Sequence, residues 1–450
     1  MSQPIALELE QPRLTFTASG GSVVTRTVHP SGVRILSEAV PGAHSTSIGL
    51  WVAVGSRDED EVAYGSTHFL EHLLFKGTRT LSALDIAIAF DRVGGEHNAL
   101  TAKEHTCYYA KVQDVDLEMA VGVLANMVAD SLLHKDEFEV ERQVILEELA
   151  MADDDPSDVA HERIAENVLG DHPLGRPIGG SPETIRASTR DAVDAHYRRY
   201  YRPDELVVTA AGALDHDRLV DWVITGLRNS GWDLGGSHAP TPRRDSTLAP
   251  IRREGSARVI NKPLEQAVVA LATPGLNASD PRRHALTVLS SVLGGGMSSR
   301  LFQEVREKRG LAYSVYSFQS SYADAGVFGM AAGTSPDNAE VVARVMLDQL
   351  RTLAESGITD EELERTRGNL RGASALALEN METRMVRLGR SELTTGEFLD
   401  RDAALARLDL VDLAQVQSLA QDIAGRGLSA VAVGPVPEES LASIVHSSDT

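Results

Sequence analysis

The sequence predicts an α+β protein built from two similar domains. Apolar strand-like runs alternate with long amphipathic helical segments along a chain of 450 residues, of which 42% are hydrophobic. Matching segments recur about 220 residues apart, which indicates two copies of one domain rather than a solenoid. Residues 235–256 are rich in glycine, proline and serine and are typical of a linker. We therefore expect domains at 1–234 and 257–450, joined by a linker at 235–256.

The elements of the first half have counterparts in the second half. The pairs are a strand-like run at 47–55 and 267–273, two successive helices at 116–150 and 338–374, and a strand followed by an acidic-capped helix at 206–224 and 428–445. Strands mixed with long helices in each half predict a sheet packed with helices in each domain.

Composition excludes several classes of protein. The formal charge of -22 argues against a general binder of nucleic acid or of anionic membranes. Cys107 is the single cysteine, so no disulfide can form within the chain. No segment approaches the ~18 continuous apolar residues of a membrane helix, and residues 1–14 lack the basic start of a targeting peptide. We expect a cytoplasmic protein, in which the acidic runs 58–61 and 153–155 are solvated loops.

Residues 68–72 read His-Phe-Leu-Glu-His. On a helix, positions i and i+4 share a face, so His68 and His72 can bind one ion, and Glu71 can reach a water molecule on that ion. We expect Ser66 or Thr67 to cap the start of this helix. The alternative is a surface helix that carries two ordinary histidines.

A catalytic zinc needs a third protein ligand. In the helix expected at 136–152, apolar residues form one broad arc, and Glu141 and Glu148 fall in the middle of it. A carboxylate in a buried stripe costs several kcal/mol unless it is paired or binds a metal. We therefore predict Glu148 as a zinc ligand and Glu141 as a residue that orients a ligand or water. The alternative is that the arc faces a wet cavity or that basic groups pair with both carboxylates.

These two motifs together resemble the pitrilysin/insulinase-type zinc peptidases. His68 to Thr78 and Glu141 to Glu148 are most similar to the branch of the mitochondrial processing peptidase and its short bacterial relatives. The resemblance implies one Zn²⁺ per chain, bound by His68, His72 and Glu148. It also implies that Glu71 is the general base and that Glu141 is a supporting acid.

The resemblance extends to the edge strand and to the second half. Residues 94–104 resemble the family's edge strand, which implies that Asn98 and Ala99 hold the substrate backbone by β-augmentation. An ordinary turn and strand is the alternative there. Residues 293–302 resemble a glycine-rich loop that contacts substrate, which implies such a role for Gly294, Gly295 and Gly296, although a flexible turn explains them equally. Arg306 and Tyr313 match an Arg and a Tyr that reach the zinc site in the family.

The resemblance implies a zinc-dependent endopeptidase that hydrolyses short or unfolded peptides. Its two halves would form a clamshell around a chamber. Relatives of this length form dimers, so we expect a homodimer. We expect a peptide substrate and neither nucleic acid nor membrane as partner. The alternative is a non-catalytic structural or partner subunit of a peptidase-like complex, although such subunits typically lose the zinc residues that are all present here.

Overall fold

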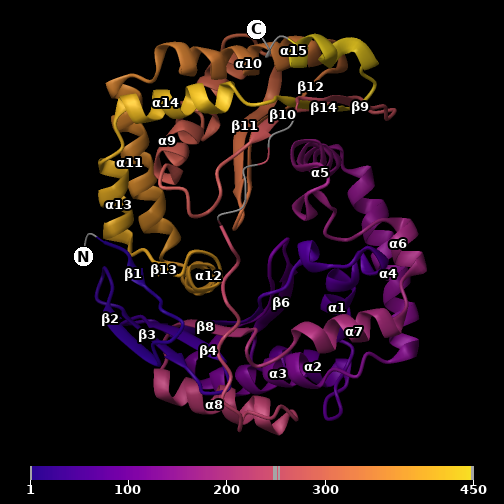
Figure 1. Cartoon of the computed structure of the whole chain (residues 1–450), viewed down its shortest axis with the longest axis vertical. Coiled ribbons are helices and arrows are strands. Elements are labelled where there is room, and N and C mark those ends of the chain that lie inside the picture. Colours follow the sequence, from indigo (N-terminus) through magenta and orange to yellow (C-terminus); the bar gives the residue numbers. More distant parts are fainter. Residues whose placement is uncertain (1–2, 247–250, 252–253, 447–450) are drawn as a thin grey trace. The chain divides into compact units, whose positions relative to one another are not determined.

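The computed structural model describes residues 3–246, 251 and 254–446 (Figure 1). Residues 247–250 and 252–253 of the predicted linker lie outside the described residues. The chain groups into two compact units. Unit 1 comprises residues 1–149, 176–243 and 374–403, and unit 2 comprises residues 150–175, 244–373 and 404–450. Each unit thus includes a segment from the other half of the sequence. The domains at 1–234 and 257–450, which follow the two similar halves of the sequence, stay a prediction.

Unit 1 is built on a seven-stranded sheet in the order β2-β3-β4-β8-β5-β7-β6. Only the β4–β8 pair in it is parallel. Its strands are β2 (Arg13–Thr17), β3 (Val23–Val28), β4 (Arg34–Ala39), β5 (Ser45–Val52), β6 (Glu96–Thr101), β7 (Thr106–Gln113) and β8 (Leu206–Gly212); β1 (Ile5–Ala6) pairs separately with β13 (Glu397–Phe398).

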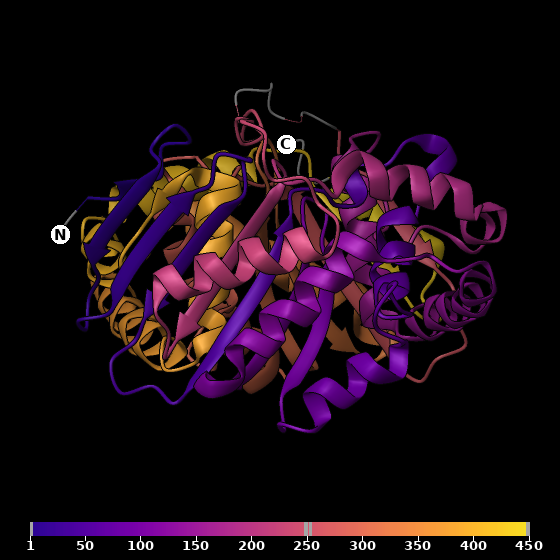
Figure 2. The same cartoon turned by 90° about the horizontal axis from the view of Figure 1, so that it is seen from below.

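Helices cover both faces of this sheet. They are α1 (Ser66–Leu74), α2 (Ala83–Asp91), α3 (Leu117–Asp130), α4 (Lys135–Asp154), α6 (Pro182–Ala187), α7 (Arg190–Tyr200), α8 (His216–Asn229) and α12 (Met381–Arg390). Figure 2 shows α3 and α8 side by side across one face, where the main apolar core lies. The other face packs against α12, which comes from the second half of the chain.

Buried charges fasten the segment of α12 to the sheet of unit 1. Arg26 on β3 donates two hydrogen bonds, of 2.9 and 3.0 Å, to Glu392, and both side chains are fully buried. Glu38 on β4 is likewise buried and pairs with Arg384 and Arg387 of α12. A buried pair of this kind is costly to break because it leaves one charge without a partner.

Unit 2 repeats the plan with a five-stranded sheet in the order β11-β12-β10-β14-β9. Its strands are β9 (Ala257–Ile260), β10 (Ala267–Pro274), β11 (Ala312–Ser321), β12 (Gly326–Thr334) and β14 (Ser429–Val433). Its helices are α5 (Pro156–Leu169), α9 (Arg283–Gly294), α10 (Ala339–Ser356), α11 (Asp360–Ala377), α13 (Arg401–Asp409), α14 (Leu413–Ala424) and α15 (Ala442–His446), and the units divide α4, α11 and α13 between them.

The two faces of this second sheet are also covered by helices from different parts of the chain. The helices α9, α10 and α14 build the larger core on one face. On the other face α5, which precedes the sheet by about a hundred residues, packs against β10 and β14. Each sheet therefore receives one helix from the other half of the chain.

The predicted fold class of two similar α+β domains is confirmed. The strands β5 and β10, the helix pairs α3–α4 and α10–α11, and the strands β8 and β14 occupy the positions where the sequence predicts matching elements. Both sheets are mainly antiparallel. Among the described helices, none combines the length and the apolar character that a membrane span requires. The predicted chamber remains a prediction.

Candidate metal centre

The helix α1 carries His68, Glu71 and His72 in unit 1. Its apolar face, with Phe69, Leu70, Leu73 and Leu74, is buried in the core. The Phe69 ring stacks on Phe138 of α4 with centroids 4.2 Å apart and planes 7° apart. Because this contact fixes α4 against α1, a residue further along α4 can meet the histidines.

The start of α1 is stabilised from a distance. Gly65 precedes the helix with φ of 90°, a conformation that favours glycine, and no side chain caps the helix locally. Ser66 and Thr67 lie inside the helix, so the predicted cap is wrong. Instead Glu59 accepts hydrogen bonds from the backbone amides of Gly65 (2.8 Å) and Thr67 (2.7 Å). A carboxylate here satisfies free N–H groups and meets the positive end of the helix dipole.

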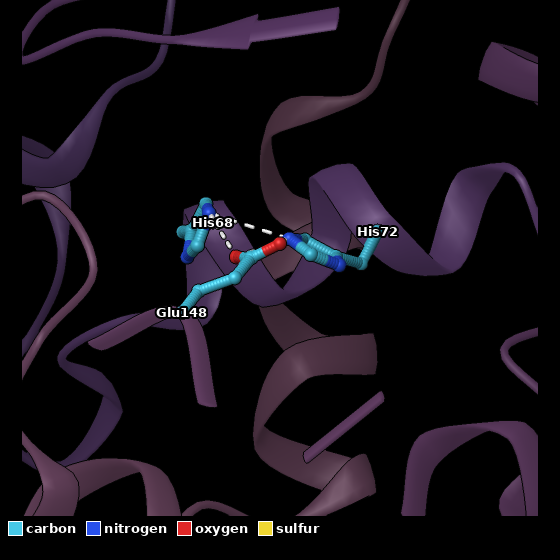
Figure 3. A group of neighbouring side chains, drawn as sticks. All are labelled: His68, His72 and Glu148. Atoms are coloured by element: carbon cyan, nitrogen blue, oxygen red, sulfur yellow. Dashed lines mark hydrogen bonds and ion pairs between the residues drawn. The ribbon is translucent and has the colours of Figure 1, made fainter. Parts of the chain in front are cut away.

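The structure brings His68, His72 and Glu148 together, and Figure 3 shows the Glu148 carboxylate between the two imidazoles. The two Nε2 atoms lie 3.3 Å apart. Glu148 Oε2 lies 3.2 Å from His72 Nε2 and 3.7 Å from His68 Nε2. Tetrahedral zinc with bonds of about 2.0–2.2 Å places its ligand atoms roughly 3.3–3.6 Å apart, so the three atoms fit such an ion.

Glu141 lies behind His72. Its Oε2 accepts a hydrogen bond of 2.9 Å from His72 Nδ1, and its Oε1 lies 2.6 Å from Lys76 Nζ. The Glu141 side chain is only 3% exposed. With a proton on Nδ1, the lone pair of His72 Nε2 points to the other side of the ring, where His68 and Glu148 lie.

His68 is also suited to bind a metal ion. Burial lowers the pKa of His68 to about 4, with a smaller contribution from His72. The imidazole is therefore neutral at neutral pH, which is the state that coordinates metals. The Nδ1 atom of His68 is buried and has no hydrogen-bond partner among the described residues.

The predicted burial of Glu148 is wrong. On α4 the buried residues are Phe138, Glu141 and Ile145, whereas the Glu148 side chain is 46% exposed. Val140, Val144 and Met151, which are apolar residues of the same helix and part of that arc, are exposed as well. Amphipathic periodicity assumes that an apolar arc faces the core, and here part of that arc faces outward beside the histidines. The argument from burial therefore holds for Glu141 alone.

Glu71 lies on the same helix, next to His72. Burial raises the pKa of Glu71 above its ordinary value, while hydrogen bonds from the hydroxyl and backbone amide of Thr101 oppose that shift. Thr101 is the last residue of β6, which ends the sheet order of unit 1 and so forms an edge in the described part of the chain. Asn98 and Ala99 lie on this strand, and Asn98 Oδ1 accepts a hydrogen bond from the amide of Ala99.

The predicted residues of the second half lie in unit 2. Arg306 donates a hydrogen bond of 3.1 Å to the Tyr313 carbonyl, and its guanidinium lies 4.5 Å from the centre of the Tyr313 ring. Tyr313 is 79% exposed. Gly294 ends α9 where a side chain would strike the backbone of β11, and Gly295 is crowded by Ser291, so close packing accounts for both. Gly296 has open space around it.

Three contributing residues escaped the sequence analysis. Glu59 lies in the acidic run predicted to be a solvated loop, yet it is only 5% exposed. Lys76 and Thr101 lie within the motifs, but no role at the site was predicted for either of them. Each contacts α1 or Glu141 only through the tertiary fold. The positions of two of these residues in the sequence could have pointed to a role at the site. Lys76 follows the histidine helix, and Thr101 ends the strand predicted to hold substrate.

Comparison with known proteins identifies the family. Residues 34–181 match the family model described as Insulinase (Peptidase family M16), and residues 187–370 match Peptidase M16 inactive domain. An uncharacterized zinc protease of Streptomyces coelicolor is 46% identical over 427 residues, covering 95% of this chain and 93% of its own length. The uncharacterized zinc protease YmxG of Bacillus subtilis is 37% identical over 404 residues, covering 89% and 96%.

Solved structures share the fold at low sequence identity. A protease from Helicobacter pylori has a TM-score of 0.83 at 22% identity and covers 96% of this chain and 100% of its own. A structure described as the peptidase M16 inactive domain from Pseudomonas fluorescens has a TM-score of 0.81 at 19% identity, with coverage of 95% and 98%. With relatives named zinc proteases across nearly its whole length, the chain belongs to the insulinase-type M16 family of peptidases.

Proposed function

We propose that this chain is a zinc-dependent endopeptidase that hydrolyses short or unfolded peptides. The observation that carries the proposal is the convergence of His68, His72 and Glu148 at distances that suit tetrahedral zinc, with Glu71 on the same helix. Three protein ligands leave one position open for water or substrate, as catalytic zinc sites do. The same donor atoms also accept other divalent metals, so metal analysis is part of the test.

The chain's own residues divide the chemistry. A zinc ion held by the three ligands would lower the pKa of a water molecule towards ~7 and polarise the scissile carbonyl. Glu71 takes the proton from the attacking water and passes it to the leaving amine. Its raised pKa suits a group that must both accept and release a proton. Glu141 holds the tautomer of His72 through the bond to Nδ1.

On the basis of the family resemblance, we also propose roles for residues of β6 and of the second half. Asn98 and Ala99 on β6 would pair with the substrate backbone, and the place of β6 at the end of the described sheet supports that role. Arg306 and Tyr313 would donate hydrogen bonds to the carbonyl oxygen as negative charge develops on it. Gly296, which lies in open space, is the member of the glycine-rich loop best suited to contact a peptide. A homodimer with one zinc per chain completes the proposal.

The test is Glu71→Gln, compared with wild type and with Glu147→Gln, an exposed glutamate on α4 outside the cluster. Cleavage of an internally quenched peptide and zinc content are measured for each protein. We expect Glu71→Gln to abolish cleavage while zinc stays bound, because the ligands are untouched, and Glu147→Gln to behave as wild type. Normal cleavage by Glu71→Gln would contradict the assignment of the base. If the zinc-loaded wild-type protein cleaves no peptide, either with or without a chelator, the result would favour the alternative that the chain is a non-catalytic partner subunit.

A further inference from the structure

Among the described residues, Thr101 is the one residue of another element that hydrogen-bonds to Glu71. The hydroxyl of Thr101 donates to Glu71 Oε2, and the backbone amide of Thr101 hydrogen-bonds to the same carboxylate. Thr101 is only 7% exposed, although the rest of β6 is half-buried or exposed. Two donors at the end of strand β6 therefore hold the carboxylate of Glu71, which belongs to a different element, the helix α1.

Such a contact restricts the base. A glutamate side chain has three rotatable bonds, and a free one populates many rotamers. A general base works only within about 2.6–3.2 Å of the proton it removes, so a carboxylate that swings freely is seldom in place. Donors from Thr101 reduce that freedom before substrate arrives, and β-branched threonine is itself restricted at χ1. The hydroxyl therefore has a fixed direction towards α1.

We propose that Thr101 is a positioning residue, which fixes Glu71 relative to the strand that carries the substrate. The inference rests on the proposed peptidase function, in which Asn98 and Ala99 on β6 pair with the peptide. Thr101 follows them by only two or three residues on the same strand. A peptide bound along β6 and the carboxylate of Glu71 are then held by one rigid element.

The chain offers a matched control on the neighbouring strand. Thr106 lies directly opposite Thr101 in the β6–β7 pair and is fully buried. Its hydroxyl donates a hydrogen bond of 3.0 Å to the carbonyl of Val54, not to a residue of the cluster. Thr106→Val therefore removes a buried hydroxyl from the same part of the sheet and leaves Glu71 untouched.

The experiment compares Thr101→Val, Thr101→Ser and Thr106→Val in the zinc-loaded full chain. Thr101→Val keeps the shape but loses the hydroxyl donor, and we expect kcat to fall about 10–100-fold with little change in KM, because misplacement of a reacting group acts on the chemical step. Thr101→Ser restores the donor, and kcat should return to within about threefold of wild type. Zinc content should be unchanged in all three, and Thr106→Val should retain wild-type kcat.

Two outcomes overturn the inference while leaving the peptidase function standing. One is wild-type kcat in Thr101→Val when Glu71→Gln is inactive. The other is an equal loss of kcat in Thr101→Val, Thr101→Ser and Thr106→Val, which would reduce the effect to packing of the sheet. A cycle of melting temperatures for Thr101→Val, Glu71→Ala and the double variant tests the contact without activity, because alanine removes the acceptor oxygen that glutamine would keep. We expect non-additive shifts, and additive shifts would contradict the contact. Failure of wild type to cleave any peptide would instead overturn the proposed function, and the positioning role with it.

Discussion

Glu141 shows how one buried carboxylate can serve a metal site without touching the metal. It is placed between the Nδ1 of His72 and the ammonium of Lys76, and both contacts are shorter than 3 Å. A buried carboxylate with two such partners is compensated for its loss of water. The bond to Nδ1 also makes the imidazole a better ligand, because it fixes the tautomer and the orientation of the ring.

At the residue scale we therefore predict that Glu141→Gln weakens zinc binding by about 10–100-fold, the usual cost of losing a partner of a ligating histidine. Competition with a chelator of known affinity measures the change. Glu147→Gln, seven residues from the end of the same helix and exposed, is the control. Equal zinc affinity in wild type and Glu141→Gln would show that His72 needs no partner.

The helix α1 depends on a residue outside it. Glu59 satisfies two amides at its N-terminus, and Thr67 adds a contact of 3.1 Å between its hydroxyl and His196 Nε2. Burial raises the pKa of Glu59 from 4.5 to about 7, although the hydrogen bonds from Thr67 and Gly65 oppose the shift. The element that carries both histidines and the base is thus held by a group that titrates near neutral pH.

A pH dependence of stability follows at the element scale. Because the pKa of Glu59 is higher in the folded chain than its ordinary value of 4.5, the folded state binds more protons than the unfolded state between 4.5 and about 7. The contribution of Glu59 to stability is therefore full below pH 4.5 and is lost as the pH rises to about 7. We predict that wild type loses up to about 1.4 kcal/mol per pH unit relative to Glu59→Gln in this window.

Denaturant unfolding of both proteins across the window measures this difference, with the same zinc loading throughout. Burial lowers the pKa of His196 to about 4. Because His196 is present in both proteins, its contribution cancels when wild type is compared with Glu59→Gln. Asp60→Asn changes the exposed neighbour of Glu59 and should leave the pH profile as in wild type. Parallel profiles for wild type and Glu59→Gln would contradict the prediction.

Exchange of helices between the halves is the main feature of the whole molecule. One face of the sheet in unit 1 is completed by α12, and one face of the sheet in unit 2 is completed by α5. In the described part of the chain, each sheet thus buries one face against a helix from the other half of the sequence. Ion pairs also join the sheet of unit 1 to the segment of α12. They connect Arg26 with Glu392 and Glu38 with Arg387 of α12.

The proposed reaction also draws on both halves, which yields a prediction at this scale. Arg306→Ala and Tyr313→Phe should each lower kcat by roughly 10²–10³-fold, as the loss of an oxyanion donor does. Zinc content should stay at the wild-type level, since neither residue is a proposed ligand. Lys308→Ala, an exposed neighbour paired with Glu304, is the control. Wild-type kinetics in both variants would show that unit 2 does not complete the site.

The sequence alone was sufficient for features that depend on local pattern. Periodicity identified the helix pairs α3–α4 and α10–α11, and recurrence of the same elements identified the two similar domains. The spacing of His68 and His72 required only that one short helix form. Such features are visible because residues three or four apart on a helix, or two apart on a strand, share an environment whatever the rest of the chain does.

Tertiary structure alone decided the surroundings of these residues. Periodicity placed Glu148 in a buried stripe, but the outer part of that stripe is exposed beside the histidines. Glu59 supports the start of α1, Thr101 holds Glu71, and α5 and α12 are exchanged between the halves. Each of these contacts joins residues that no local pattern in the sequence connects. Whether a charged side chain faces water or a buried partner depends on which distant segment packs against it, and that is fixed only when the whole chain folds.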